Sequence, residues 1–398
     1  MPLAADQLPY LDVSAPGFSV SSAEVRAARE RGWCARTPYG LAVLRYAEMG
    51  ALLKDRRLKQ GSAGWPAHHG VTSGPVVDWW ARTVLNQEGE DHHRLRRLLN
   101  PAFSPKLIAD LRPRFAALAD ELMDGFAAAG RCEFMADFGI PYAGRVIAIM
   151  LGIPEELWRG LAGWATDLGL LTSVQVAERI DDIEAAYRGL AAFSDELVAD
   201  RERAPRDDFV TRLVAAQRDE ERLTPQELQD SLVILIFGGF DTTSMQLGLA
   251  LQTFMDHPDQ WERLAAEPSL GEAAVEEVMR VNPTVTWVTR EAIEDFEFGG
   301  VQIAAGTTIH LFSQAAGSDP AAFPDAGFDI TAPRRRHFGF GGGVHHCIGH
   351  FVARGDMSEA LPRLAQRLRD PVPDGPARSM PQSGNTGPLE LPIRFRAG

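Results

Sequence analysis

Cysteine is scarce in this chain, and its scarcity limits how the fold can be held together. The 398 residues contain 3 cysteines, Cys34, Cys132 and Cys347, an odd number at wide spacing. Such a set argues against a disulfide framework and favours a reducing compartment, expected here to be the cytoplasm. It also lacks the two paired ligand modules that a structural zinc site usually needs.

Targeting and membrane signals are lacking too. The first residues, MPLAADQLPYLDV, have neither a basic nor an apolar region, so we expect no signal peptide. Polar residues from Asp241 to Gln246 interrupt the most apolar run, which predicts a buried helix and no membrane span. Lys and Arg number 40 against 54 Asp and Glu, and a net charge of −14 disfavours nucleic acid as a partner.

Helix is the dominant predicted element, and 45% hydrophobic residues are ample for a large buried core. Capping boxes in SSAE, residues 21–24, and TPQE, residues 224–227, mark two helix starts. Helices are predicted over 21–31, 46–54, most of 91–164, 174–201, 224–255, 270–280 and from 347 past 361. The β-rich portions are predicted near 33–45, 285–311 and 377–395, and residues 60–78 are predicted to form a long loop.

The segment FGFGGGVHHCIGHFVAR, residues 338–354, holds one cysteine among histidines and glycines. One interpretation is a buried cysteine that packs as a small hydrophobe. The glycines argue against it, because they permit unusual backbone angles and the close approach of a flat group. We expect Cys347 at the start of a helix, where free amides and the helix dipole favour a thiolate. A thiolate ligand of heme iron uses all of these features.

The stretch from Phe340 to Gly349 resembles the heme-binding loop of the cytochrome P450 superfamily. It matches F-G-x-G-x-H-x-C-x-G at all six fixed positions. The resemblance implies a mainly helical triangular prism, here one domain over 1–398, with heme between a long central helix and the cysteine-bearing helix. It implies that Cys347 binds the iron of heme b and that Phe340, His345 and Gly349 lie against the cofactor.

The apolar helix contains GGFDTT, residues 238–243. Mid-helix glycines cost about 1 kcal/mol each relative to alanine, so we infer an opened helix in which Thr242 bonds back toward the Gly238 carbonyl. A bent core helix with a polar patch is the alternative. The stretch resembles the family's (A/G)-G-x-D-T-T, which implies that Asp241 and Thr242 are the acid–alcohol pair that delivers protons during oxygen activation.

Two further motifs agree with this resemblance. His92 and Arg96 are spaced as in the helix that grips the heme propionates, with Arg290 and His345 as the other partners; a solvated basic face is the alternative. Glu277 and Arg280 resemble the family's buried E-x-x-R pair. Its usual third arginine is replaced by Ala332, so we expect a substitute among residues 334–336.

The implied activity is that of a heme-thiolate monooxygenase. It would use O₂ and electrons from a separate ferredoxin or flavodoxin with its reductase to hydroxylate or epoxidise a small secondary metabolite. Radical coupling of aromatic substrates is the alternative on the same scaffold, and a non-catalytic heme carrier would not need the acid–alcohol pair. We expect a monomer whose carrier docks on Arg94, Arg97 and residues 334–336. By analogy the substrate contacts are Trp65, Val285, Thr286, Trp287 and Thr386, although the tryptophans of the 60–85 loop, Trp65, Trp79 and Trp80, could instead only pack that loop onto the body.

Overall fold

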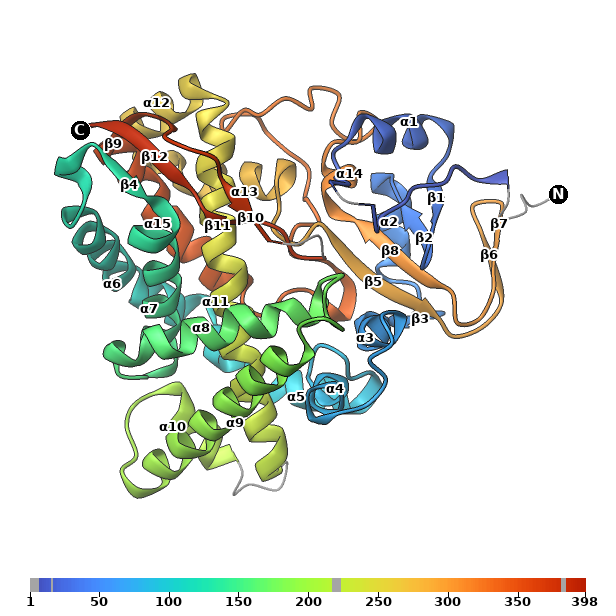
Figure 1. The fold of residues 1–398 in the computed structure, drawn as a ribbon, viewed down its shortest axis with the longest axis horizontal. Coiled ribbons are helices and arrows are strands. Elements are labelled where there is room, and N and C mark those ends of the chain that lie inside the picture. Colours follow the sequence, from blue (N-terminus) through green and yellow to red (C-terminus); the bar gives the residue numbers. More distant parts are fainter. Residues whose placement is uncertain (1–6, 16, 217–222, 381–383) are drawn as a thin grey trace.

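Most of the helices lie on one side of the molecule and the largest sheet lies on the other (Figure 1). The computed structural model describes residues 7–15, 17–216, 223–380 and 384–398. Its helices are α1 (Ala23–Arg31), α2 (Tyr46–Leu52), α3 (Trp65–His68), α4 (Pro75–Arg82), α5 (Gly89–Leu99), α6 (Pro105–Asp124), α7 (Ile140–Leu151), α8 (Trp158–Gly169), α9 (Ile180–Arg203), α10 (Phe209–Ala216), α11 (Pro225–Met255), α12 (Pro258–Ala266), α13 (Gly271–Val281), α14 (Ser313–Gly317) and α15 (His350–Arg367).

The largest sheet has five strands in the order β1-β2-β8-β5-β3. β2 and β8 run parallel, and the other pairs are antiparallel. A second sheet, β4-β12-β9, lies on the helical side (Figure 1). The strands are β1 (Cys34–Thr37), β2 (Gly40–Val43), β3 (Leu58–Gln60), β4 (Arg131–Glu133), β5 (Trp287–Ala292), β6 (Phe296–Phe298), β7 (Val301–Ile303), β8 (Thr308–Phe312), β9 (Leu368–Pro373), β10 (Arg378–Ser379), β11 (Pro388–Glu390) and β12 (Pro392–Ala397).

The long helix α11 runs through the middle of the helical side. Its start is fixed as predicted: Thr224 accepts from the Glu227 amide, and the Glu227 carboxylate accepts from the Thr224 amide. By length and composition α11 resembles a membrane-crossing helix, but 83% of its most apolar window is buried inside the protein. Helices α7, α8 and α9 pack along it, so its apolar residues form core.

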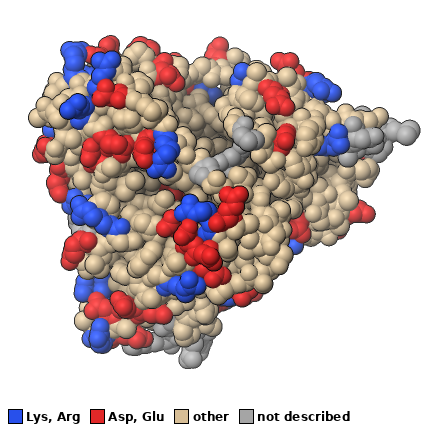
Figure 2. Space-filling model, in the orientation of Figure 1, with Lys and Arg blue, Asp and Glu red and all other residues tan. Residues whose placement is uncertain are grey.

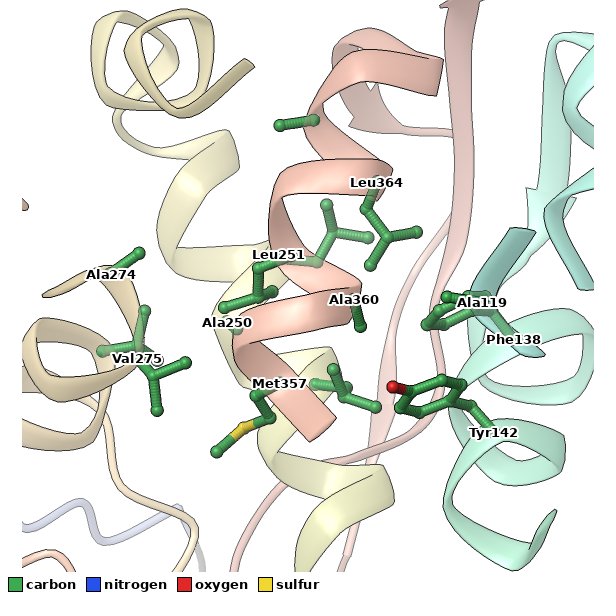
Figure 3. Close-up of a cluster of buried hydrophobic side chains, with 14 of the residues drawn as sticks. Ala119, Phe138, Tyr142, Ala250, Leu251, Ala274, Val275, Met357, Ala360 and Leu364 are labelled. Atoms are coloured by element: carbon green, nitrogen blue, oxygen red, sulfur yellow. The ribbon is translucent and has the colours of Figure 1, made fainter. Parts of the chain in front are cut away.

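One hydrophobic cluster joins α15 to α11, α13 and the segment before α7 (Figure 3). Met357, Ala360 and Leu364 of α15 lie between Leu251 of α11 and Tyr142 of α7. The Tyr142 hydroxyl donates to the Asp356 carbonyl at 2.9 Å, so even this buried polar group is paired. The cluster anchors the helix that follows the cysteine loop.

Several predicted boundaries are wrong, each for a local reason. Residues 60–78 contain α3 and the start of α4 instead of a continuous loop, because Trp65, Trp79 and Trp80 are buried and hold the segment against the body. The first helix is capped by Ser22, whose hydroxyl accepts from the Val25 amide, and so has no capping box. The helix predicted from 174 begins six residues later, and strands β3 and β4 were not predicted.

On the face shown in Figure 2, acidic and basic side chains are interspersed and no large area carries one sign of charge. The surface in that view is hollowed between the helical side and the five-stranded sheet. On this face the excess of acidic residues therefore forms no single large patch.

Candidate functional site

The cysteine loop is a tight backbone structure between the sheet and α15. The Cys347 amide donates to the Phe340 carbonyl at 3.0 Å, which closes the loop. Gly341 and Gly343 have φ values of +65° and +70°, in the left-handed region that favours glycine. A Cβ at Gly343 would lie 2.2 Å from the Leu53 carbonyl oxygen, so close backbone packing also excludes a larger residue there. The predicted reason for the glycines, unusual angles and close approach, is confirmed.

Cys347 itself lies three residues before α15, which begins at His350, so the prediction that it starts the helix is wrong. Its side chain is exposed, yet burial among the surrounding chain raises the pKa of its thiol, which the Gly349 amide, Arg96 and Arg354 only partly offset. Both observations hold if the thiol faces an internal space enclosed by the protein. A metal ion held by the sulfur would favour the thiolate and so lower this pKa.

α11 is continuous α-helix through residues 238–243, so the predicted opening is not found there, whereas the predicted bond of Thr242 is present. The Thr242 hydroxyl donates to the Gly238 carbonyl at 2.7 Å. The two glycines differ: a Cβ at Gly239 would lie 2.2 Å from the Ile147 side chain, whereas a Cβ at Gly238 would have no atom within 4 Å. Gly239 therefore lets α7 approach, and Gly238 borders open space within an otherwise buried helix.

Asp241, the neighbour of Thr242, is 1% exposed and carries one carboxyl oxygen, Oδ2, without a partner. Burial raises the pKa of Asp241 to about 7, and a hydrogen bond from Asn385 opposes that shift. A carboxyl group with this pKa is present in both protonation states near neutral pH. It can both give and take a proton there.

The structure brings the predicted propionate partners together. The rings of His92 and His345 lie 4.2 Å apart. His92 is 2% exposed with neither ring nitrogen partnered, and burial, then His345 and Arg96, lowers its pKa to about 4. Arg290 is 4% exposed, and burial lowers its pKa to about 10. Buried basic groups of this kind need anionic partners.

Sequence reasoning missed Glu88 and Gln60, which join this cluster. The Glu88 carboxylate lies 3.1 Å from His345 Nε2 and accepts from the Gln60 backbone amide. The Gln60 side chain in turn accepts from Arg290 at 2.5 Å. An acidic residue just before α5 suggests a helix cap, but Glu88 makes no capping bond, so its true partner could not be found from sequence.

These residues fit the heme that the motif implies. Unpartnered His92 nitrogens near Arg96, in a cluster that Glu88 and Gln60 connect to Arg290, suit the carboxylates of a propionate-bearing group. Cys347 offers a reachable sulfur, and Arg96 lies close enough to affect its pKa. The left-handed glycines of the loop and open Gly238 leave room for a flat group.

The buried pair beneath the loop is confirmed in geometry. Arg280 donates to both Glu277 oxygens, at 2.6 and 2.7 Å. Arg334 Nη2 lies 3.1 Å from the same carboxylate, so it takes the place of the arginine missing at Ala332. The other two candidates, Arg335 and Arg336, make no such contact in the described part of the chain.

The expected substrate contacts separate into two groups. Val285 forms an antiparallel β-bridge with Asn385. On either side of this bridge, the Thr286 amide donates to the Gly384 carbonyl and the Thr386 amide donates to the Thr284 carbonyl. Val285, Thr286 and Thr386 are therefore neighbours, close to Asp241 through Asn385.

The second group, Trp65 and Trp287, lies around the buried His310, with ring distances of 5.9 and 5.5 Å, and Trp287 also packs against Gly384 of the first group. Val288, adjacent to Trp287, approaches Gly341 of the cysteine loop. Because neighbours along a strand point to opposite faces, Trp287 points away from that loop. Trp65 is buried and its indole N–H donates to the Ser173 carbonyl at 3.1 Å, which favours the packing interpretation for that tryptophan.

Comparisons with known proteins agree with the geometry. The family model for cytochrome P450 matches residues 174–389. Luteothin monooxygenase of Streptomyces thioluteus is 38% identical over 98% of this chain and 97% of its own. Mycinamicin IV hydroxylase/epoxidase of Micromonospora griseorubida is 33% identical over 90% of this chain and 91% of its own. The solved structure of a cytochrome P450 enzyme for C–S bond formation in chuangxinmycin biosynthesis matches with a TM-score of 0.86, at 28% identity over 98% of each chain.

Proposed function

Because this chain belongs to the cytochrome P450 family and is an oxidoreductase of the monooxygenase type, we propose that it hydroxylates or epoxidises a bacterial secondary metabolite. The predicted fold is confirmed by the structural match. The observation that carries the proposal is the Asp241–Thr242 pair beside open Gly238 in the same chain as the Cys347 loop. A heme carrier has no use for such a pair.

The chain holds its cofactor, proposed to be heme b, by three groups of residues. Cys347 binds the iron, while His92, Arg96, Arg290 and His345 bind the propionates. When bound, a thiolate-ligated heme supplies oxygen activation and O–O bond cleavage. Phe340 and Gly349 frame the loop on the sulfur side.

On the other side, the protein moves protons. The Thr242 hydroxyl is held by Gly238, and the Asp241 carboxyl passes a proton toward it and regains one from solvent. Val285, Thr286 and Thr386 border the substrate; their contacts with or next to Asn385, the hydrogen-bond partner of Asp241, support this role.

Electrons are proposed to come from a separate ferredoxin or flavodoxin with its reductase, to a monomer in the cytoplasm. Of the arginines expected at the docking site, Arg94 pairs with Glu227 and Arg334 with Glu277. Arg335 and Arg336 are exposed, and Arg336 affects the pKa of His346 in the cysteine loop. These two arginines support docking on the cysteine side of the molecule.

Radical coupling remains the second candidate, because a structural relative is named for C–S bond formation. Turnover of candidate polyketides with a surrogate ferredoxin and reductase under ¹⁸O₂ separates the two. A product that carries one labelled oxygen atom supports monooxygenation. An unlabelled product that has lost two hydrogens would favour coupling, and the absence of any turnover in a reduced, well-folded protein would contradict both.

A further inference from the structure

Asp241 is buried without a cation. Burial and the Asn385 hydrogen bond are the causes of its pKa shift, and no charged side chain of the described residues contributes. Charged groups on the elements packed around it are engaged elsewhere: Arg145 of α7 with Glu121, Asp167 of α8 with Arg179, and Glu390 of the hairpin with Arg378. The partner of this acid is a neutral amide.

The carboxyl group is tightly enclosed. A Cβ at Gly169, the last residue of α8, would lie 3.1 Å from Asp241 Oδ2 and 3.3 Å from Oδ1. Asn385 supplies the hydrogen bond, and Oδ2 has none. Because the bond lowers the pKa of Asp241, it stabilises the ionised form, as a donated amide N–H does.

Asn385 is held firmly enough to orient its partner. It bridges Val285, and its two neighbours bond backbone to backbone: Thr286 donates to Gly384 at 2.9 Å, and Thr386 donates to Thr284 at 2.7 Å. Gly387 packs on α11, where a Cβ would lie 2.4 Å from Met245 Cβ. Residues 384–387 are thus fixed both to the segment proposed to meet substrate and to the helix that carries the acid.

We propose that Asn385 is the positioning residue of Asp241. Its side-chain amide orients the Asp241 carboxyl group for proton delivery. It also stabilises the ionised carboxylate, as a neighbouring cation would do. This inference rests on the proposed function, in which Asp241 gives a proton toward Thr242 and regains one from solvent for each of the two protons that a turnover consumes. Residues 384–386 are also hydrogen-bonded to residues 284–286. A substrate that displaces residues 284–286 should therefore displace Asn385, and with it the Asp241 carboxyl group.

Infrared spectroscopy of the substrate-free holoenzyme tests the hydrogen bond directly. The C=O band that disappears in Asp241→Asn reports the protonated carboxyl, and its pH midpoint is expected near 7 in the unaltered protein. In Asn385→Ala the midpoint should rise by about one pH unit, the size of one lost hydrogen bond to the ionised form. In Asn385→Ser, whose hydroxyl can still donate a hydrogen bond, the midpoint should rise by less than in Asn385→Ala. In Ser379→Ala, at the exposed end of the hairpin, the midpoint should not change.

An unchanged midpoint in both Asn385 variants, with the reduced carbon monoxide-bound spectrum intact, would overturn the inference. The proposed function has its own arm: the pH profile of NADPH oxidation through a surrogate ferredoxin and reductase. In Asn385→Ala the midpoint of this pH profile should rise together with the infrared midpoint. In Asp241→Asn the rate of NADPH oxidation should lose its dependence on pH in this range. If Asp241→Asn kept the unaltered profile, proton delivery by Asp241 would be refuted, even with the hydrogen bond demonstrated.

Discussion

The propionate cluster and the Asp241 carboxyl are both buried polar sites, and each leaves polar atoms without a partner. The cluster gathers His92, His345 and Arg290 from distant segments, and its main internal anion is Glu88. Asp241 is a single acid satisfied by a neutral amide. The first arrangement is suited to bind an external anion, and the second to exchange a proton. Burial alone therefore does not define a role; the charge of the neighbours does.

Arg290→Leu tests the cluster most severely. It removes a buried guanidinium that is proposed to pair with a heme propionate, and uncompensated buried charge is costly. We expect heme to transfer to apomyoglobin on the order of a hundredfold faster, by analogy with the loss of buried ion pairs. Stopped-flow absorbance measures this transfer. Arg203→Leu, at the exposed end of α9, is the control, and equal rates for the two variants would contradict the assignment.

Arg334→Met tests the substituted arginine of the buried pair. The side chain has one charged contact with Glu277 and donates to the carbonyls of Asp325 and Gly327. Its loss should lower the free energy of unfolding by about 1–3 kcal/mol, as expected for hydrogen bonds to charged groups. Denaturant titration checks this, with Arg335→Met as the neighbouring control. If the two variants lost the same free energy of unfolding, the contact of Arg334 with Glu277 would not stabilise the fold.

His310 extends the comparison to a buried base that has no anionic partner. Burial lowers the pKa of His310 to about 3. As the pH falls from 6.5 to 5, His310 becomes protonated in the unfolded state but stays neutral in the folded state. The free energy of unfolding therefore decreases as the pH falls. The contribution lost over that range is about 1.5 kcal/mol. His310→Gln should therefore lose less stability on acidification than the unaltered protein, measured by denaturant titration at both pH values; an identical loss would contradict this.

The smallest effect is expected at the docking surface. Reversing charge in Arg335→Glu with Arg336→Glu should slow first-electron transfer from an acidic ferredoxin several-fold, more at low salt than at high salt. Stopped-flow reduction under carbon monoxide measures the rate. Arg31→Glu on α1, on the sheet side of the molecule, is the matched control. If the double variant were reduced at the unaltered rate at low salt, the carrier would not dock at Arg335 and Arg336.

What the sequence predicts well is local. The Thr224 capping box, the Thr242 bond to Gly238 and the glycines of the cysteine loop depend on residues within a few positions of one another. Contacts between distant segments were not predictable: Glu88 with His345, and Asn385 with Asp241. The Gly, Pro and Ser content of residues 60–78 predicts a loop, but buried Trp65, with Trp79 and Trp80 just beyond the segment, holds it against the body in α3 and the start of α4.

Ligation of iron by Cys347 is the claim on which the rest depends. The absorption spectrum of the reduced, carbon monoxide-bound protein tests it most directly. We predict a strongly red-shifted Soret band that Cys347→Ser lacks, because only a thiolate ligand produces that shift. A band at the position typical of histidine ligation, or one that survives the serine substitution unchanged, would contradict the account.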